Sequence, residues 1–258
     1  MIKIEHTVLA SPEQMEFIIE GMRNPMNSWD KSDSQVCNYM FKGCCGSCEK
    51  KNNGCRTYSE ENDFYMGIYD YTLMQHLSKA GTDHRKFMRM MPVYVRITAP
   101  LYWWKEFDTY KVGTVANSCS TMHKIVEKEF TLDDFSTDHL FGGPLRNLEY
   151  DIRVLNECRN LYLQWDGLSD EERGHINSKI HDKKDIWWQM IQLLPSSYNQ
   201  TRNVMMNYEV LANIYKSRKD HKLDEWREFC RWIQTLPYQE LINGEYIISY
   251  DSCKIDLQ

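Results

Sequence analysis

The chain has 258 residues, a formal net charge of −6, 42% hydrophobic residues and 26% charged residues. This composition is enough to bury a core and argues against a disordered chain. The negative charge disfavours nucleic acid and anionic membranes as partners, and the glycines form neither GxGxxG nor GxxxxGK[ST], the common nucleotide-binding motifs.

The expected compartment follows from two further features. No apolar run approaches the roughly 18 residues that a membrane helix needs. The first residues, MIKIEHTVLA, lack the basic and apolar regions of a secretory signal peptide. We therefore expect a cytoplasmic protein with reduced cysteines rather than a disulfide framework.

The first part of the chain alternates between regular elements and one long irregular segment. Ser11, Pro12 and Gln14 predict a helix start with a capping box, and apolar residues follow at helical spacing. The predicted elements are a strand over 3–9, a helix after Ser11, an insertion over about 24–62, a helix over 69–80, a strand over 93–97 and a helix over 101–107.

The rest of the chain is predicted to be mainly helical, after a loop of small polar residues from Gly113 to His123. The predicted elements are helices over 147–165, 182–194, 200–218 and 223–235, and a short closing strand over 246–250. The strand content is too small for a doubly wound parallel sheet. We predict one α+β domain over 1–258, with a modest mixed or antiparallel sheet packed with several helices and a predominantly helical C-terminal half.

Five cysteines lie within the insertion and form the first candidate site: Cys37, Cys44, Cys45, Cys48 and Cys55. Cys45 and Cys48 have the two-residue spacing of a zinc knuckle, because thiolates close in sequence can converge on a tetrahedral ion. A structural zinc site is one interpretation. A flexible insertion with reduced thiols is the other.

The segment from Ala99 to His123 is the second candidate. Trp103 and Trp104 are adjacent, so a helix that buries one ring turns the other about 100° away. The polar stretch after Gly113 offers ligand hydrogen bonds; the alternative is core aromatics followed by a polar turn. Cys119 is a weak nucleophile candidate because the sequence supplies no base for it.

Two further clusters complete the candidates. His84, Arg85, Lys86 and Arg89 can bind phosphate or form a solvated face. Asn207, Asn213 and Arg218 share a broad sector of the predicted helix over 200–218, where asparagine is a mediocre helix former. These three residues either have a hydrogen-bonding role in a site or are simply exposed polar residues of the helix.

These last three regions resemble, in the same chain order, the signature regions of the flavin-dependent thymidylate synthases, the ThyX family, from about residue 63 to 235. Ala99-Pro100-Leu101 is similar to the entry of a motif like Arg-His-Arg-x-x-Ser-x-Asn-Glu-x-Ser-x-Arg-Tyr. An ungapped alignment places Thr109-Tyr110-Lys111 at Arg-His-Arg, Thr114 at the first Ser and Ala116-Asn117 at Asn-Glu. A one-residue bulge instead matches Asn117 to the Asn and Ser120 to the second Ser.

The C-terminal resemblance is better. Leu194-Pro195 followed by Asn207, Asn213 and Arg218 is similar to a Leu-Pro…Asn…Asn…Arg spacing of the family. Asp220-His221 and Asp224-Glu225-Trp226 resemble its charged closing stretch. The departures lie upstream, where only Lys111 of the Arg-His-Arg is basic and the late arginine falls on Thr121 or Met122. The family's Ser-x-x-Glu-His stretch is replaced by residues 84–89, whose cations we expect to supply the missing charge.

The resemblance implies reductive transfer of a one-carbon unit from methylenetetrahydrofolate to C5 of dUMP or a related pyrimidine nucleotide. FAD reduced by NADPH supplies the electrons, no protein nucleophile attacks the base, and the protein is a homotetramer. The implied cofactor-binding residues are Asn207, Asn213, Lys111, His84, Arg85, Lys86 and Arg89. The implied substrate-binding residues are Arg218, Glu106, Asn117, Ser118, Ser120 and Thr121. Two alternatives stay open, a nucleotide-binding or regulatory protein that lost the reaction and a zinc-organised interaction module.

Overall fold

The computed structural model describes residues 2–36 and 64–245. The contacts of the chain divide it into two compact units. The first unit comprises Met1–Glu5, Arg96–Thr109 and Ala116–Asn203, and the second comprises His6–Val95, Tyr110–Val115 and Val204–Gln258. The cysteine cluster at 37–55 and the closing strand predicted over 246–250 lie outside the described residues.

Four strands form a sheet in the order β1-β4-β6-β5, and each has residues in both units. They are β1 (Lys3–Leu9), β4 (Pro92–Pro100), β6 (Asn199–Asn207) and β5 (Val115–Ser118). Leu101 donates its N–H to the carbonyl of Tyr198 at 3.0 Å, and Tyr208 donates to that of Met91 at 3.1 Å. The residue numbers therefore run in opposite directions along β4 and β6, which makes this pair antiparallel.

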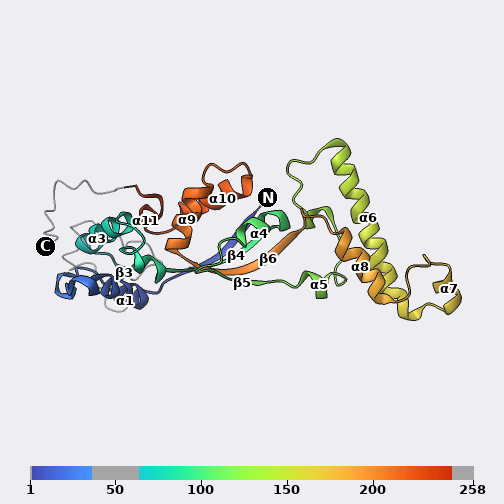
Figure 1. Ribbon diagram of the computed structural model, residues 1–258, viewed down its shortest axis with the longest axis horizontal. Coiled ribbons are helices and arrows are strands. Elements are labelled where there is room, and N and C mark those ends of the chain that lie inside the picture. Colours follow the sequence, from blue (N-terminus) through green and yellow to red (C-terminus); the bar gives the residue numbers. More distant parts are fainter. Residues whose placement is uncertain (1, 37–63, 246–258) are drawn as a thin grey trace, which may run out of the picture. The chain divides into compact units, whose positions relative to one another are not determined.

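The first unit is mainly helical. Its helices are α4 (Leu101–Phe107), α5 (Thr121–Lys124), α6 (Gly142–Gln164), α7 (Asp170–Gly174) and α8 (Lys183–Leu193). Helices α6 and α8 pack side by side (Figure 1), and Leu148, Leu155 and Met190 are buried in the core that they share. Short 3-10 turns lie at Leu132–Asp134 and Trp165–Gly167.

In its described residues, the second unit combines a two-stranded sheet, β2 (Gln35–Val36) with β3 (Phe64–Tyr65), and several helices. The helices are α1 (Pro12–Arg23), α3 (Ile68–Lys79), α9 (Tyr208–Arg218), α10 (Asp224–Ile233) and α11 (Glu240–Asn243), with 3-10 turns at Asn24–Met26, Trp29–Lys31 and Lys86–Arg89. The predicted capping box at the start of α1 is present, since the Ser11 hydroxyl accepts from the Gln14 N–H and the Gln14 side chain accepts from the Ser11 N–H. Helix α9 packs against α10 and α11.

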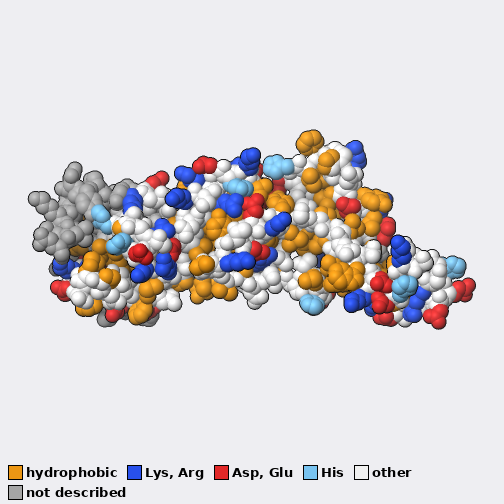
Figure 2. Space-filling model, in the orientation of Figure 1, with side chains coloured by type: hydrophobic (Ala, Val, Ile, Leu, Met, Phe, Trp, Pro, Cys, Tyr) orange, Lys and Arg blue, Asp and Glu red, His pale blue; other side chains and the backbone are white. Residues whose placement is uncertain are grey.

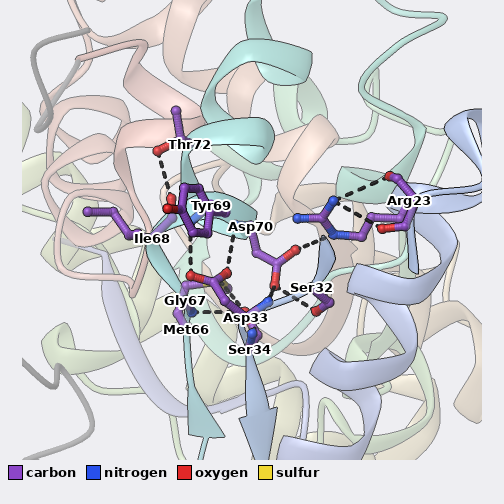
Figure 3. Close-up of polar contacts among 11 residues, drawn as sticks. Arg23, Ser32, Asp33, Ser34, Met66, Gly67, Ile68, Tyr69, Asp70 and Thr72 are labelled. Carbon is purple, nitrogen blue, oxygen red and sulfur yellow. Dashed lines mark hydrogen bonds and ion pairs between the residues drawn. The ribbon is translucent and has the colours of Figure 1, made fainter. Parts of the chain in front are cut away.

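A buried ion pair ties α1 to α3 within the second unit (Figure 3). The Nε of Arg23 donates to Asp70 at 2.5 Å, and the second Asp70 oxygen accepts from the Ser32 hydroxyl at 2.8 Å. The backbone N–H groups of Asp33 and Ser34 donate to the same oxygen. This network fixes residues 32–34, which lead into β2, against the first turn of α3.

The predicted helix over 200–218 is wrong in its first half. Residues 199–207 form strand β6, where Val204 and Met206 are buried and the intervening Met205 is less so. This period of two is the pattern of a strand. The helix begins only after Asn207, whose Oδ1 accepts the N–H of Val210 at 3.0 Å and caps α9.

The prediction of a loop from Gly113 to His123 is also partly wrong, because strand β5 and the single helical turn α5 lie in this segment. All four residues of β5 are exposed at an edge of the sheet, so no apolar alternation marks the strand in the sequence. The other helices and strands that were predicted within the described residues agree with the structure to within a few residues, although α6 begins five residues earlier, at Gly142 rather than Asn147. The short elements β2, β3, α7 and α11 were not predicted.

Two features bear on the excluded partners. No helix within residues 2–36 and 64–245 has the length and apolarity needed to cross a membrane. On the face drawn in Figure 2, Lys and Arg side chains are interspersed with Asp and Glu and form no continuous basic stripe.

Candidate functional site

Arg218, at the end of α9, is held between aromatic side chains of the second unit. Its Nε donates to the hydroxyl of Tyr110 at 2.9 Å, and its guanidinium carbon lies 4.7 Å from the ring centroid of Trp226. Its Nη1 lies 2.9 Å from Nε2 of His221. These contacts hold the guanidinium in a defined orientation, which is the requirement for binding a phosphate or carboxylate.

The basic cluster after α3 converges on α9. Arg85 donates from Nε to Glu209 Oε1 at 3.1 Å and from Nη2 to Asn213 Oδ1 at 3.2 Å. Arg89 pairs with the same Glu209 carboxylate. The structure thus brings together three residues predicted from sequence: Arg85, Arg89 and Asn213. His84 and Lys86 are exposed on the same turn.

Glu209 partly neutralises this cluster. Burial alone would raise the pKa of Glu209, but the hydrogen bonds from Arg89 and Arg85 outweigh burial and lower that pKa. The carboxylate is therefore ionised at neutral pH and cancels one of the two guanidinium charges. Sequence reasoning missed Glu209, and the available signal was its four-residue spacing from Asn213 on the α9 helix.

Asn207 has a structural task in the second unit. Its Oδ1 caps α9, and its Nδ2 lies against Gly113, where a Cβ atom would come within 2.9 Å of it. Gly113 has φ +76°, a conformation that glycine adopts without strain. The contact of Asn207 with flavin stays a prediction, because its side chain is buried against the chain's own backbone.

The predicted substrate contacts of the first unit gather around β5 and α5. Asn117 and Ser118 are exposed on β5, and Ser120 caps α5 by accepting the His123 N–H at 3.2 Å. Thr121 accepts from Gln200 Nε2 at 2.9 Å. Glu106 is half-buried on α4, whereas Lys111 belongs to the second unit and is exposed. Their roles in binding stay predictions.

Arg202 lies in the same part of the first unit and was missed in the sequence. Its Nη1 donates to Asp108 at 2.7 Å, and its guanidinium carbon lies 4.2 Å from the ring centroid of Trp104. The assignment of residue 202 to a helix hid its position on β6, where its guanidinium lies over the ring of Trp104. Arg202 is therefore a further cation beside the predicted substrate contacts.

The two adjacent tryptophans are both core residues, contrary to the expectation that one ring would turn away. Trp103 and Trp104 are 0% and 1% exposed; Trp103 stacks on Phe107, and Trp104 packs against it edge to face. Trp104 Nε1 donates to the carbonyl of Gln200 at 2.9 Å. Both rings are buried because each packs against Phe107, and Trp104 also contacts β6 at Gln200. Cys119 is exposed at the end of β5.

Metal binding is not supported by the described part of the chain. Residues 2–36 and 64–245 contain no group of three or more His, Cys, Asp or Glu side chains arranged to hold an ion. The predicted zinc ligands, Cys37, Cys44, Cys45, Cys48 and Cys55, lie outside those residues.

Comparison with known proteins gives a structural likeness alone. No protein-family model and no curated protein matches the chain. A structure of the flavin-dependent thymidylate synthase ThyX from Helicobacter pylori, complexed with FAD and dUMP, covers 94% of this chain and 98% of its own, with a TM-score of 0.56 and 15% identity. A second structure of that protein with FAD and dUMP covers 95% and 98%, with a TM-score of 0.55 and 13% identity. The chain therefore has a ThyX-like α+β fold, which confirms the predicted fold class.

Proposed function

We propose that the chain is a flavin-dependent enzyme of the thymidylate synthase type. It transfers a one-carbon unit from methylenetetrahydrofolate to C5 of dUMP or a related pyrimidine nucleotide, as a cytoplasmic homotetramer. The observation that carries the proposal is the orientation of Arg218 between Tyr110 and Trp226 in a chain of ThyX-like fold. The resemblance assigns the nucleotide phosphate to this arginine.

The residues around Asn213 fit a flavin dinucleotide. Arg85 donates a hydrogen bond to Asn213 Oδ1. This contact orients the carboxamide so that its N–H groups can donate to a flavin carbonyl. Arg85 and Arg89 together exceed the Glu209 carboxylate by one positive charge, which suits a dinucleotide's negative charge. The solved neighbours were complexed with FAD and dUMP, which supports the same pair of ligands here.

The chain's own residues supply binding and orientation. When bound, FAD carries the electrons between NADPH and the transferred carbon unit. Arg218 holds the nucleotide phosphate, and the Tyr110 hydroxyl and the Trp226 ring restrict its rotation, so less entropy is lost on binding. Arg85 fixes the orientation of the Asn213 carboxamide. None of these roles requires a protein nucleophile.

Glu209 favours a second candidate, a nucleotide-binding protein on the same fold that has lost the reaction. Its carboxylate consumes part of the positive charge that the sequence assigns to cofactor binding. Asn207 is likewise committed to capping α9. Turnover separates the two candidates: methylated nucleotide should form with NADPH and methylenetetrahydrofolate in the first, and ligands should bind without product in the second.

Binding is tested on the purified full chain by flavin absorbance and thermal unfolding with dUMP or dCMP. A nucleotide at 100 times its Kd should stabilise the folded chain by about 2.7 kcal/mol and raise Tm. Arg218→Gln should abolish this shift and keep the flavin. Arg153→Gln is the control, because Arg153 is 65% exposed and its contacts with Glu157 and the Tyr150 ring lie on its own helix. A wild type without flavin and without a nucleotide shift would contradict the proposal.

A further inference from the structure

A hollow of about 250 Å³ lies in the second unit, where α1 faces the segment that follows it in the chain. Helix α1 contributes Glu16, Ile19, Glu20 and Arg23 to its lining, and the following segment contributes Trp29. The hollow therefore combines an aromatic ring, an apolar side chain and ionisable groups. It shares no residue with the proposed nucleotide and flavin contacts.

Arg23 is the one cation among the described residues that line the hollow, and its charge is already neutralised (Figure 3). Its Nε donates to Asp70 at 2.5 Å, and the side chains of both residues are buried. The hydroxyl of Ser32, which also lines the hollow, donates to the second oxygen of Asp70. This pair therefore contributes no net charge to a ligand in the hollow.

Glu16 and Glu20 carry charge that the described chain leaves uncompensated. Within residues 2–36 and 64–245, neither carboxylate accepts a hydrogen bond or forms an ion pair. The two residues lie one helical turn apart, where like charges destabilise a helix. Asp30 and Lys31 on the adjacent turn are exposed, have opposite charges and do not line the hollow. The lining therefore has an excess of two negative charges.

Trp29 offers its ring to whatever occupies the hollow. The residue is 48% exposed, and its Nε1 donates to Oδ1 of Asn24 at 2.8 Å. This hydrogen bond satisfies the only polar atom of the side chain and fixes the orientation of the ring. Tryptophan has the aromatic ring that attracts a cation most strongly. The ring and the two carboxylates therefore favour the same kind of ligand, a cation.

We propose that this hollow binds the ammonium groups of a short aliphatic polyamine. Two carboxylates one turn apart match two positive charges along a carbon chain, and Ile19 offers apolar surface to the methylene groups. The volume is below the roughly 300–1,000 Å³ of most small-molecule sites, which suits a narrow chain rather than a ring system. A metal ion fits less well, because the described residues contain no group of three or more ligating side chains.

Calorimetric titration of the full chain with diaminopentane at low ionic strength tests the site. One molecule per chain should bind, and added salt should weaken binding because the charges are close to solvent. Pentanediol has the same carbon chain without the charges and should not bind. A capped lysyl-lysine dipeptide carries the same ammonium groups, so the tighter of the two charged probes distinguishes a free polyamine from lysines of another chain. Either order supports the site. No binding of both charged probes, or equal binding of the diol, would overturn the proposal.

Variants make the test specific to the hollow. Glu16→Gln/Glu20→Gln should weaken diaminopentane binding about tenfold, and Trp29→Leu should weaken it about threefold. Glu149→Gln/Glu157→Gln is the matched control, because it removes the same charge from an exposed helix of the first unit and should leave binding unchanged. The double variant of α1 removes a like-charge pair, so it should fold normally by circular dichroism. Equal weakening by the two double variants would show attraction to net charge alone and overturn the proposal.

Discussion

Asp70 has the least exposed carboxylate among the described residues, with 0% of its surface accessible. A buried charge is tolerated only when it is paired and hydrogen-bonded. Arg23 provides the opposite charge, and Ser32 with the backbone of Asp33 and Ser34 provides the remaining donors. The stability of the second unit therefore depends on this side chain.

We predict that Asp70→Asn lowers the free energy of unfolding by about 3 kcal/mol, because it leaves the buried Arg23 charge without a counterion. Urea unfolding measures the loss. Glu127→Gln is the control, since Glu127 pairs with Lys124 on the surface with 58% of its side chain exposed. That variant should change stability by less than about 1 kcal/mol. Equal effects of the two substitutions would refute the prediction.

The same residue predicts a pH dependence. Burial alone would raise the pKa of Asp70, but the hydrogen bonds from Ser34, Ser32 and Arg23 outweigh it and lower that pKa. A folded-state pKa below the unfolded value of about 3.9 gives stability that is present above that value. It is lost as pH falls through the folded-state pKa. The wild type should therefore lose more stability on acidification than Asp70→Asn, and parallel curves would contradict this.

At the scale of elements, periodicity predicted most helices because their buried residues recur every three or four positions. It failed for β6, where Val204-Met205-Met206 fits a strand or a helix equally well. Only the tertiary pairing with β4 decides between them. The same error hid the cap at Asn207 and put both asparagines on one helix. The meeting of Arg85 with Glu209 could not be predicted, because their 124-residue separation leaves no local pattern.

The two asparagines should therefore respond differently to substitution. Asn207→Ala should destabilise the chain by about 1–2 kcal/mol, because α9 loses its cap and the buried Val210 N–H loses its acceptor. Asn207→Asp keeps an acceptor and should retain most of that stability. Asn213→Ala should change stability by less than about 0.5 kcal/mol, since the residue is exposed, yet should lower flavin content. Chemical denaturation and flavin absorbance measure these effects, and equal destabilisation by both alanine variants would exclude this division of roles.

At the scale of the whole molecule, a fold and a binding site place different demands on the amino-acid sequence. The ThyX-like fold persists at 13–15% identity, because a buried pattern tolerates exchange among apolar residues of similar volume. A binding site tolerates less, because charge and donor geometry must match a ligand. Here the cations come from residues 84–89 and the end of α9, and an acidic side chain moderates them.

Hydrogen exchange on the full chain should locate nucleotide binding within it. Arg218, Tyr110 and Trp226 all belong to the second unit, so dUMP should slow the local openings that disrupt their contacts. At 100 times Kd, amides of Tyr110–Val115, α9 and α10 should exchange about a hundredfold more slowly. Amides of α6 and α8 are the internal control and should be unchanged. Slowing at Ala116–Thr121 as well would support the substrate contacts inferred at Asn117, Ser118, Ser120 and Thr121. Slowing confined to α6 and α8 would place the nucleotide away from Arg218 and contradict its role.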